Sequence, residues 1–290
     1  MTGFALALVL AAASIHASFN LLAKRAGAAD STAFVCLGNF VSMVAFAPFA
    51  IGSLVLLRPA ITAVTFAFIA LSGIIHICYC LSLQRAYRIG DLSLVYPIAR
   101  GTGPLLATLG AVLVLGERPG LTALAGIALL VLGIFQISGL GRRGAAHGRG
   151  AWLAVASALV PAVFTATYTV WDKYCLGLLM VPPVFYLWFN QVVRGVILTP
   201  YALRHRVEVR EVWRRYRREA IGVGVLSPLN YVLILFALTV TPVSYVAPAR
   251  EISILIAAVL GKRLLAEGVG HHRLIGAAAM TIGLICLALG

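Results

Sequence analysis

Ten long apolar stretches dominate this chain and limit what it can fold into. Each holds roughly 18 or more mostly apolar residues, and a helix needs about 20 to cross the hydrocarbon core of a bilayer. The chain has 290 residues, of which 61% are hydrophobic and 11% charged, and this excludes a water-soluble globular enzyme. We therefore predict an all-α membrane protein. Its ten transmembrane helices are expected at residues 3–23, 32–57, 62–84, 93–116, 120–140, 151–171, 183–203, 220–241, 244–262 and 271–290.

The basic residues predict how the chain is oriented in the membrane. The formal net charge is +14, but Lys and Arg lie almost entirely in the gaps between apolar stretches, which argues against a nucleic-acid partner. The connections 1–2, 3–4, 5–6, 7–8 and 9–10 hold 17 of them, seven between Arg204 and Arg218, whereas the opposite connections hold Arg58, Arg118 and Lys173. Cytoplasmic loops carry the positive excess. We expect a multi-pass protein of the cytoplasmic (inner) membrane with both termini outside the cytoplasm and a loop or surface helix at 204–218.

The two halves of the chain carry a weak internal repeat. Because each half holds five predicted spans, an odd number, the second copy must enter the membrane upside down. We expect five-helix repeats at 1–140 and 151–290, joined by a basic, glycine-rich linker at 141–150. At an offset of 150 residues, the aligned pairs are Ala99-Arg100 with Ala249-Arg250, Glu117 with Glu267, Gly126 with Gly276, and Gly133 with Gly283.

The corner after the fourth stretch is similar to that of a known family. The fourth stretch ends in Leu115-Gly116-Glu117-Arg118-Pro119, and Gly126-Ile127 and Leu132-Gly133-Ile134 follow in the fifth. Together with the ten-span layout, these residues resemble proteins of the drug/metabolite transporter superfamily with two EamA-type domains. The resemblance covers essentially the whole chain. It implies secondary transport of a small metabolite or drug by alternating access, without ATP hydrolysis.

Two features depart from the family pattern. The second copy of the corner is reduced to Ala266-Glu267-Gly268, so a role for Glu267 does not carry over. Family members are usually drawn with both termini in the cytoplasm, whereas the charge count of 17 against 3 places them outside. We keep the orientation that the charge count predicts.

Polar residues at spacings of four form a stripe on the first and on the seventh predicted helix. His16, Asn20 and Lys24 share one face of the first helix, and Tyr186, Asn190 and Arg194 share one face of the seventh. Such stripes are typical of the wall of a polar pathway, although bonding between neighbouring helices explains them equally well. For Arg194 the structural alternative is an ion pair with Glu251.

Charged residues also lie in the fourth and ninth stretches, each close to a proline. Arg100 follows Pro97, and Arg250 and Glu251 follow Pro248, so a proline bend beside a polar cavity is expected in both helices. Glu251 is the only acidic residue inside the predicted spans, and together with His16 it is the candidate for coupling to a proton or cation. Neutralising one of the three arginines is its alternative role. Neighbouring residues project about 100° apart on a helix, so a partner on another helix is favoured over Arg250.

The balance of three intramembrane arginines against one glutamate predicts a small anionic or zwitterionic substrate. We expect the lipid bilayer and this small molecule as partners, a proton or cation as a further one, no nucleic acid, no cofactor and no metal; the oligomeric state stays open. The expected substrate-binding residues are His16, Asn20, His76, Tyr79, Tyr96, Arg100, Tyr168, Tyr186, Asn190, Arg194, Asn230, Tyr245 and Arg250.

Two other classes of function remain open on the sequence. A membrane-embedded enzyme acting on a lipid or small metabolite would need His16, His76 and Glu251 to converge within about 4 Å of one another. A non-transporting scaffold would seal its polar stripes without leaving a cavity. The glycine spacing in the fifth and tenth stretches, which includes Gly126 and Gly283, fits packing within the chain or dimerisation.

Overall fold

The computed structural model of the chain describes residues 1–26, 32–89, 92–138, 149–256 and 271–290, and the described residues are helical almost throughout. Their helices are α1 (Gly3–Ala26), α2 (Thr32–Leu57), α3 (Ala63–Ile89), α4 (Leu92–Leu115), α5 (Leu121–Ser138), α6 (Arg149–Leu179), α7 (Pro183–Arg204), α8 (Arg206–Val240), α9 (Val243–Ala249) and α11 (His271–Leu289).

The all-α prediction is confirmed, but the number of membrane crossings is established only in part. Six helices (α1, α2, α3, α4, α6 and α8) are long and apolar enough to cross a bilayer, and α5 and α11 contain shorter apolar segments. The helix α7 has 22 residues but includes Arg194 and Arg204, and α9 stops after seven residues. A total of ten spans therefore stays a prediction.

Two helices differ from their predicted bounds in ways that matter for function. The predicted sixth span ends at residue 171, whereas α6 continues to Leu179 and carries Asp172 and Lys173 inside it. The eighth begins at Arg206 rather than at 220, because the basic segment is itself helical and joins the apolar segment at a kink where Tyr216 has φ −127° and ψ 27°.

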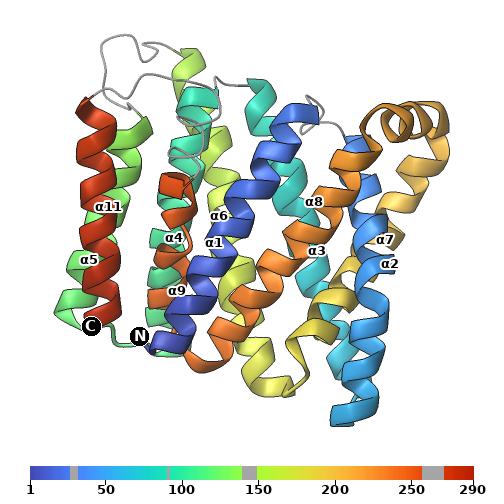
Figure 1. Cartoon of the computed structure of the whole chain (residues 1–290), viewed down its shortest axis with the longest axis horizontal. Coiled ribbons are helices and arrows are strands. Elements are labelled where there is room, and N and C mark those ends of the chain that lie inside the picture. Colours follow the sequence, from blue (N-terminus) through green and yellow to red (C-terminus); the bar gives the residue numbers. More distant parts are fainter. Residues whose placement is uncertain (27–31, 90–91, 139–148, 257–270) are drawn as a thin grey trace.

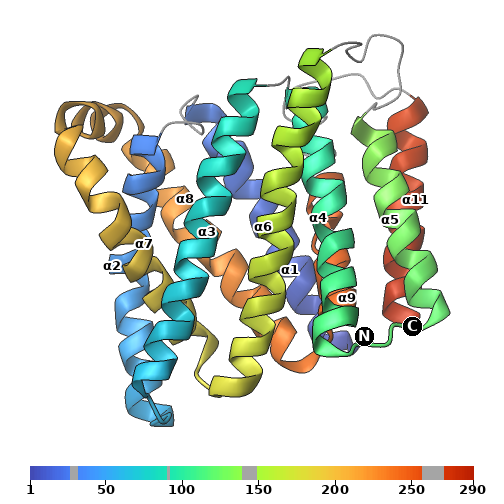
Figure 2. The same cartoon turned by 180° about the vertical axis from the view of Figure 1, so that it is seen from behind.

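The packing of the helices is largely preserved when the two halves of the chain are exchanged. The helix α1 packs on α8 as α6 packs on α3, and α2 packs on α8 as α7 packs on α3. The pairs α2–α7, α4–α9 and α5–α11 each join a helix to its own counterpart. The helix α1 starts at the end of the molecule that holds both termini, whereas α6 starts at the opposite end (Figure 1). The helices α1 and α8 lie on one face, and α3 and α6 on the other (Figures 1 and 2).

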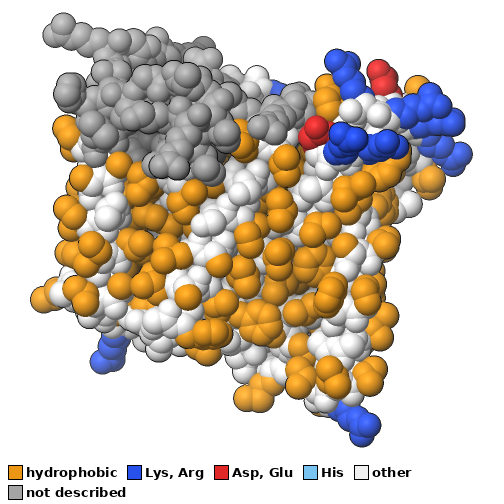
Figure 3. Space-filling view, viewed as in Figure 1, with side chains coloured by type: hydrophobic (Ala, Val, Ile, Leu, Met, Phe, Trp, Pro, Cys, Tyr) orange, Lys and Arg blue, Asp and Glu red, His pale blue; other side chains and the backbone are white. Residues whose placement is uncertain are grey.

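The outer surface is apolar over most of its height, and charge gathers at one end. Figure 3 shows hydrophobic side chains covering the helices, with Lys and Arg concentrated at the upper outer end, over the start of α8. Only 17% of the residues in the apolar window of α2 are buried, and Val44 and Leu56 are among its exposed side chains. A surface of this kind is stable only when lipid covers it.

The helices α5 and α11 meet through glycines, which shows that the glycine spacing serves packing within the chain. A Cβ on Gly126 would lie 2.7 Å from the carbonyl oxygen of Gly283, and a Cβ on Gly133 would lie 2.7 Å from that of Gly276. These backbones can approach only because neither residue has a side chain at the crossing.

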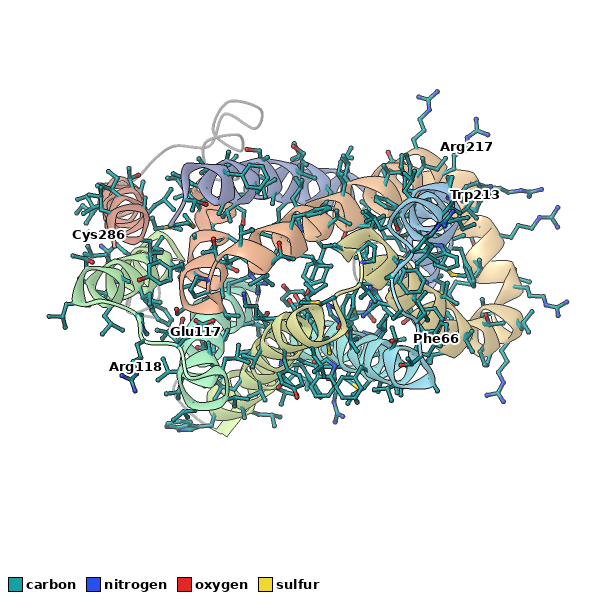
Figure 4. All side chains as sticks on the ribbon, turned by 90° about the horizontal axis from the view of Figure 1, so that it is seen from below. Phe66, Glu117, Arg118, Trp213, Arg217 and Cys286 are labelled. Atoms are coloured by element: carbon teal, nitrogen blue, oxygen red, sulfur yellow. The ribbon has the colours of Figure 1, made fainter. Side chains whose placement is uncertain are left out.

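The start of α9 depends on a carboxylate from the other half of the chain. Its cap residue Pro242 makes no side-chain cap bond, and Glu117 accepts hydrogen bonds from the backbone N–H groups of Val243 (2.7 Å) and Ser244 (2.9 Å). Gly116, with φ +69°, makes the turn that brings Glu117 there. A negative charge at a helix N-terminus also interacts favourably with the helix dipole. Arg118, by contrast, projects away from the helices (Figure 4).

Replacing Gly126 with alanine should destabilise the protein, because the new methyl group meets backbone atoms that cannot move aside. We expect a loss of about 1–3 kcal/mol, the usual cost of overpacking, seen as a lower midpoint in a thermal unfolding assay in detergent. Gly52→Ala is the matched control: it lies inside α2, nothing lies within 4 Å of its Cβ position, and the midpoint should hold or rise. Equal midpoints for the two variants would contradict this account of the crossing.

Replacing Glu117 with alanine should also destabilise the protein, since two backbone donors would lose a charged acceptor. We expect a loss of about 1–3 kcal/mol, measured by the same assay. Glu117→Gln, which keeps one carbonyl oxygen, should lose less. Arg118→Ala, at the exposed neighbouring position, should change the midpoint little, and an equal loss in that variant would argue against a capping role for Glu117.

Candidate functional site

A cavity of about 380 Å³ lies inside the helical assembly, between the α1–α8 face and the α3–α6 face. Side chains from both halves of the chain line it. It brings together ten of the 13 predicted substrate-binding residues and the predicted coupling residue Glu251. These ten are His16, Asn20, His76, Tyr79, Arg100, Tyr168, Asn190, Arg194, Asn230 and Arg250.

The cavity extends from the middle of the molecule toward the basic end. Its lining on α1 runs from His16 to Ala23, and on α2 from Phe34 to Ser42, so both segments lie toward the α1–α2 connection. Beyond its floor, toward the termini, the buried core continues with residues such as Ile69 and Leu238. At that end Lys173 donates hydrogen bonds to the backbone carbonyls of Leu238 and Thr241.

Glu251 holds two arginines in the cavity wall. Its carboxylate lies 3.3 Å from Nη1 of Arg100 and 3.3 Å from Nε of Arg250, and its side chain is 1% exposed. Arg100 also contacts Nε2 of His16, which joins α1 to this group. The guanidinium of Arg250 lies over the ring of Tyr168, with its Cζ atom 5.9 Å from the ring centroid. The sequence favoured a partner for Glu251 on another helix, and the structure gives it both Arg100 on α4 and its own neighbour Arg250.

A break in the ninth helical segment places Arg250 and Glu251 at the cavity. The helix α9 ends at Ala249, just after Pro248, and regular helix resumes at residue 252. Across the break, the N–H of Glu251 bonds to the carbonyl of Pro248 at 3.1 Å, a tighter turn than that of an α-helix. The helix α4 runs through residue 97 without the interruption seen after Pro248, and a bend at Pro97 stays a prediction.

Arg194 lies in the same cavity without an acidic partner. Among the residues that the structure describes, no carboxylate lies within ion-pair distance of its guanidinium, and Glu251 pairs with Arg100 and Arg250 instead. Its Nη2 lies 3.6 Å from Sγ of Cys80, and its buried Nε has no hydrogen-bond partner within the described part of the chain. The pairing of Arg194 with Glu251, which the sequence left open, is therefore not found.

A second polar cluster, centred on Asp172, was missed from the sequence. The prediction that Glu251 is the only acidic residue in a span is wrong, because α6 extends past Asp172 and buries it completely. Its carboxylate accepts hydrogen bonds from the hydroxyl groups of Ser72 (2.6 Å), Tyr186 (2.7 Å) and Tyr231 (2.5 Å). The apolar run that follows Tyr174 was the signal that this helix continues.

Two predicted site residues lie away from the cavity wall, and a third is not placed. Tyr186 is fully buried behind the floor, where it binds Asp172. Tyr245 donates a hydrogen bond to the carbonyl of Gly290 near the end that holds the termini. The side chain of Tyr96 lies outside the described residues. The spacing that aligned Tyr186 with Arg194 fixes a helix face, but it does not fix the depth at which the cavity ends.

The comparisons with known proteins agree with this architecture. The EamA-like transporter family matches residues 3–139 and 152–289. No curated protein matches the chain significantly. A solved structure described as "Crystal structure of protein" is similar over 100% of this chain and 98% of its own, with a TM-score of 0.79 and 13% sequence identity, which shows a shared fold. Because the family matches both halves, the chain belongs to the EamA-like transporter family and is a multi-pass membrane protein.

Proposed function

We propose that this protein is a ten-span secondary transporter, built from two inverted five-helix repeats, that moves a small anionic or zwitterionic metabolite across the cytoplasmic membrane by alternating access. The family supports transport as the general activity. A cavity of about 380 Å³ suits a small molecule, since ligand sites commonly measure about 300–1,000 Å³. The enzyme alternative has less support, because His76 pairs with Asp172 whereas His16 and Glu251 both contact Arg100.

The charge of the cavity wall carries the proposal of an anionic substrate. Among the described residues, the wall contains Arg100, Arg194 and Arg250 against Glu251, which gives three positive charges and one negative charge, a surplus of two. Glu251 offsets the arginines that it contacts, whereas Arg194 has no carboxylate partner among the described residues and keeps its charge and its Nη1 donors for a ligand. A guanidinium offers a planar set of donors that fits the two oxygens of a carboxylate or phosphate group.

Neutral polar groups nearby support a zwitterion as well as a simple anion. Asn20, Asn230 and Ser227 line the same cavity and supply amide and hydroxyl oxygens. Such oxygens can accept hydrogen bonds from an ammonium group, while Arg194 holds the acidic group of the same molecule. The substrate would then bind between the two halves, where each half contributes side chains to the wall.

The distribution of charge supports an orientation with the basic end in the cytoplasm. Lys and Arg gather at the end toward which the cavity extends, and both termini lie at the other end (Figures 1 and 3). In this orientation the described conformation faces the cytoplasm and is closed toward the outside. The broken segment at Pro248 supplies a bend at which the cavity wall can move during the transport cycle.

Replacing Arg194 with alanine should reduce uptake without unfolding the protein. Glutamate, succinate and methylphosphonate are first screened for saturable uptake into reconstituted vesicles, and the compound that the wild-type protein accepts serves as the probe. The flux of this probe should fall about tenfold to a hundredfold in Arg194→Ala, as expected for the loss of a hydrogen bond from a charged group. Arg217→Ala is the matched control, because Arg217 projects from the surface at the basic end (Figure 4). Undiminished flux in Arg194→Ala would remove Arg194 from the site.

The orientation can be tested with single cysteines in a background that lacks the five native ones. A membrane-impermeant maleimide added to intact cells should label Arg118→Cys and spare Arg210→Cys, because the two positions lie at opposite ends of the molecule. Permeabilised cells serve as the control and should show labelling at both positions. Labelling of Arg210→Cys alone in intact cells would reverse the proposed orientation.

A further inference from the structure

Asp172 is a buried acid whose partners come from three other helices. Ser72 belongs to α3, Tyr186 to α7 and Tyr231 to α8, and each donates a hydroxyl group to the carboxylate. The side chain is fully buried, and ionised groups at membrane depth are costly unless they have partners or a function. All three hydroxyl groups donate and the carboxylate only accepts, which is the hydrogen-bonding pattern of an unprotonated acid. Asp172 therefore brings a negative charge to a point where both halves of the chain meet.

His76 lies between this acid and the cavity. It lines the cavity and stacks on Tyr168 with ring centroids 4.1 Å apart. Its Nδ1 lies 3.0 Å from the carbonyl oxygen of Ser72, which can only accept, and 3.4 Å from the amide nitrogen of Asn190, which can only donate; the shorter contact favours the proton on Nδ1. Its Nε2 is buried, has no hydrogen-bond partner among the described residues, and lies 3.8 Å from Oδ2 of Asp172. The neutral ring therefore turns an unprotonated nitrogen toward a carboxylate.

We propose that the coupling proton of the transport cycle binds to Nε2 of His76, with Asp172 as its counter-ion. The inference rests on the transport function proposed above. Nε2 is buried in the described conformation, so the ring has to turn toward the cavity to take the proton of a hydronium ion, which leaves as water; the charge of the His76–Asp172 pair then changes from −1 to 0. The new N–H group points at a carboxylate and can bond to it after a small approach of the two side chains.

The charged groups around His76 link this proton to the substrate. Asp172 on α6 lies 3.8 Å from the ring and attracts a proton there, whereas Arg194 on α7 and Arg250 beyond α9 share the cavity wall with His76 and repel a positive charge. Tyr168 and Tyr231 face the ring as neutral groups from α6 and α8. An anion bound to Arg194 offsets one of the opposing charges, so substrate binding favours protonation, and protonation favours substrate binding in return. This reciprocity predicts symport of the anion with a proton.

The Glu251 cluster is less suited to this role. Both of its carboxylate oxygens already face guanidinium groups, and His16 contacts Arg100, which is a cation and not a counter-ion for a protonated ring. We therefore assign Glu251 to holding Arg100 and Arg250 in the wall. The coupling role that the sequence suggested for Glu251 and His16 passes to His76 and Asp172 in this proposal.

A titration of the histidine ring tests the proton site without any substrate. The ring nitrogens of the protein labelled with ¹⁵N-histidine are followed by NMR in detergent, and His76→Gln identifies the signal of His76. Asp172→Asn should lower the proton affinity of His76 at least fivefold, because the counter-ion is lost. Glu208→Gln, which removes an exposed carboxylate at the basic end, is the control. The proposal is overturned if the proton affinity of His76 falls less than fivefold in Asp172→Asn, or if it falls equally in Glu208→Gln.

A second variant covers the case in which Asp172→Asn does not fold. Tyr231→Phe removes a donor from Oδ2 of Asp172 and leaves that oxygen available to His76, so the proton affinity of His76 should rise at least twofold. A structural disturbance alone gives no reason for the proton affinity of His76 to fall in Asp172→Asn and to rise in Tyr231→Phe. An unchanged or lower affinity in Tyr231→Phe overturns the proposal.

Proton movement in vesicles then tests the coupling. With pyranine inside the vesicles, an inward gradient of the accepted probe should acidify the lumen, and the ratio of protons to probe should fall at least fivefold in Asp172→Asn. A ratio that stays at the wild-type value rejects His76–Asp172 as the coupling site. If none of glutamate, succinate and methylphosphonate is transported, the proposed function fails for these probes. The titration of His76 still decides whether the proton site exists.

Discussion

The cost of an ionised side chain in hydrocarbon is the constraint on which this structure depends. An arginine at membrane depth costs about 2.5–3.5 kcal/mol even on the lenient insertion scale, and three lie in the cavity wall. Glu251 offsets Arg100 and Arg250, and the break after Pro248 places it between them. The start of that broken segment is held in turn by Glu117 from the first half of the chain. The charges, the break and the cap thus form one connected arrangement at the meeting of the two halves.

The cavity wall and the buried cluster behind its floor are opposite in charge. The wall near Arg194 has a positive surplus, whereas the buried floor holds the anionic Asp172 among three hydroxyl groups. His76 lies between these regions and faces both the cavity and the acid. A carrier that couples an anion to a proton needs a binding site for each, close enough for one charge to influence the other. The spacing of these groups along α3, α6 and α7 meets that requirement.

Sequence patterns predicted the helices and much of the cavity wall, since both depend on local rules. Apolar length locates spans, and spacings of four residues place His16 with Asn20, and Asn190 with Arg194, on common helix faces. The extent of α6 was missed because an acid and a lysine inside an apolar run look the same as the end of a span. Only contacts with α3, α7 and α8 make Asp172 stable at that depth. Tyr186 was misplaced for the related reason that spacing fixes a direction and not the depth of a cavity.

If the polar side chains border a water-filled chamber with a surplus of positive charge, the native thiol of Cys80 should react with reagents that enter this chamber. Cys80 lines the cavity beside Arg194 and can be left as the sole cysteine. The rate at which Cys80 reacts with an anionic reagent, sulfonatoethyl methanethiosulfonate, is divided by its rate with a cationic reagent, trimethylammonium-ethyl methanethiosulfonate. The same ratio is measured for free 2-mercaptoethanol in solution. We predict that the ratio of anionic to cationic rate is higher for Cys80 than for the free thiol. An equal or lower ratio, or a Cys80 that does not react, would contradict the account.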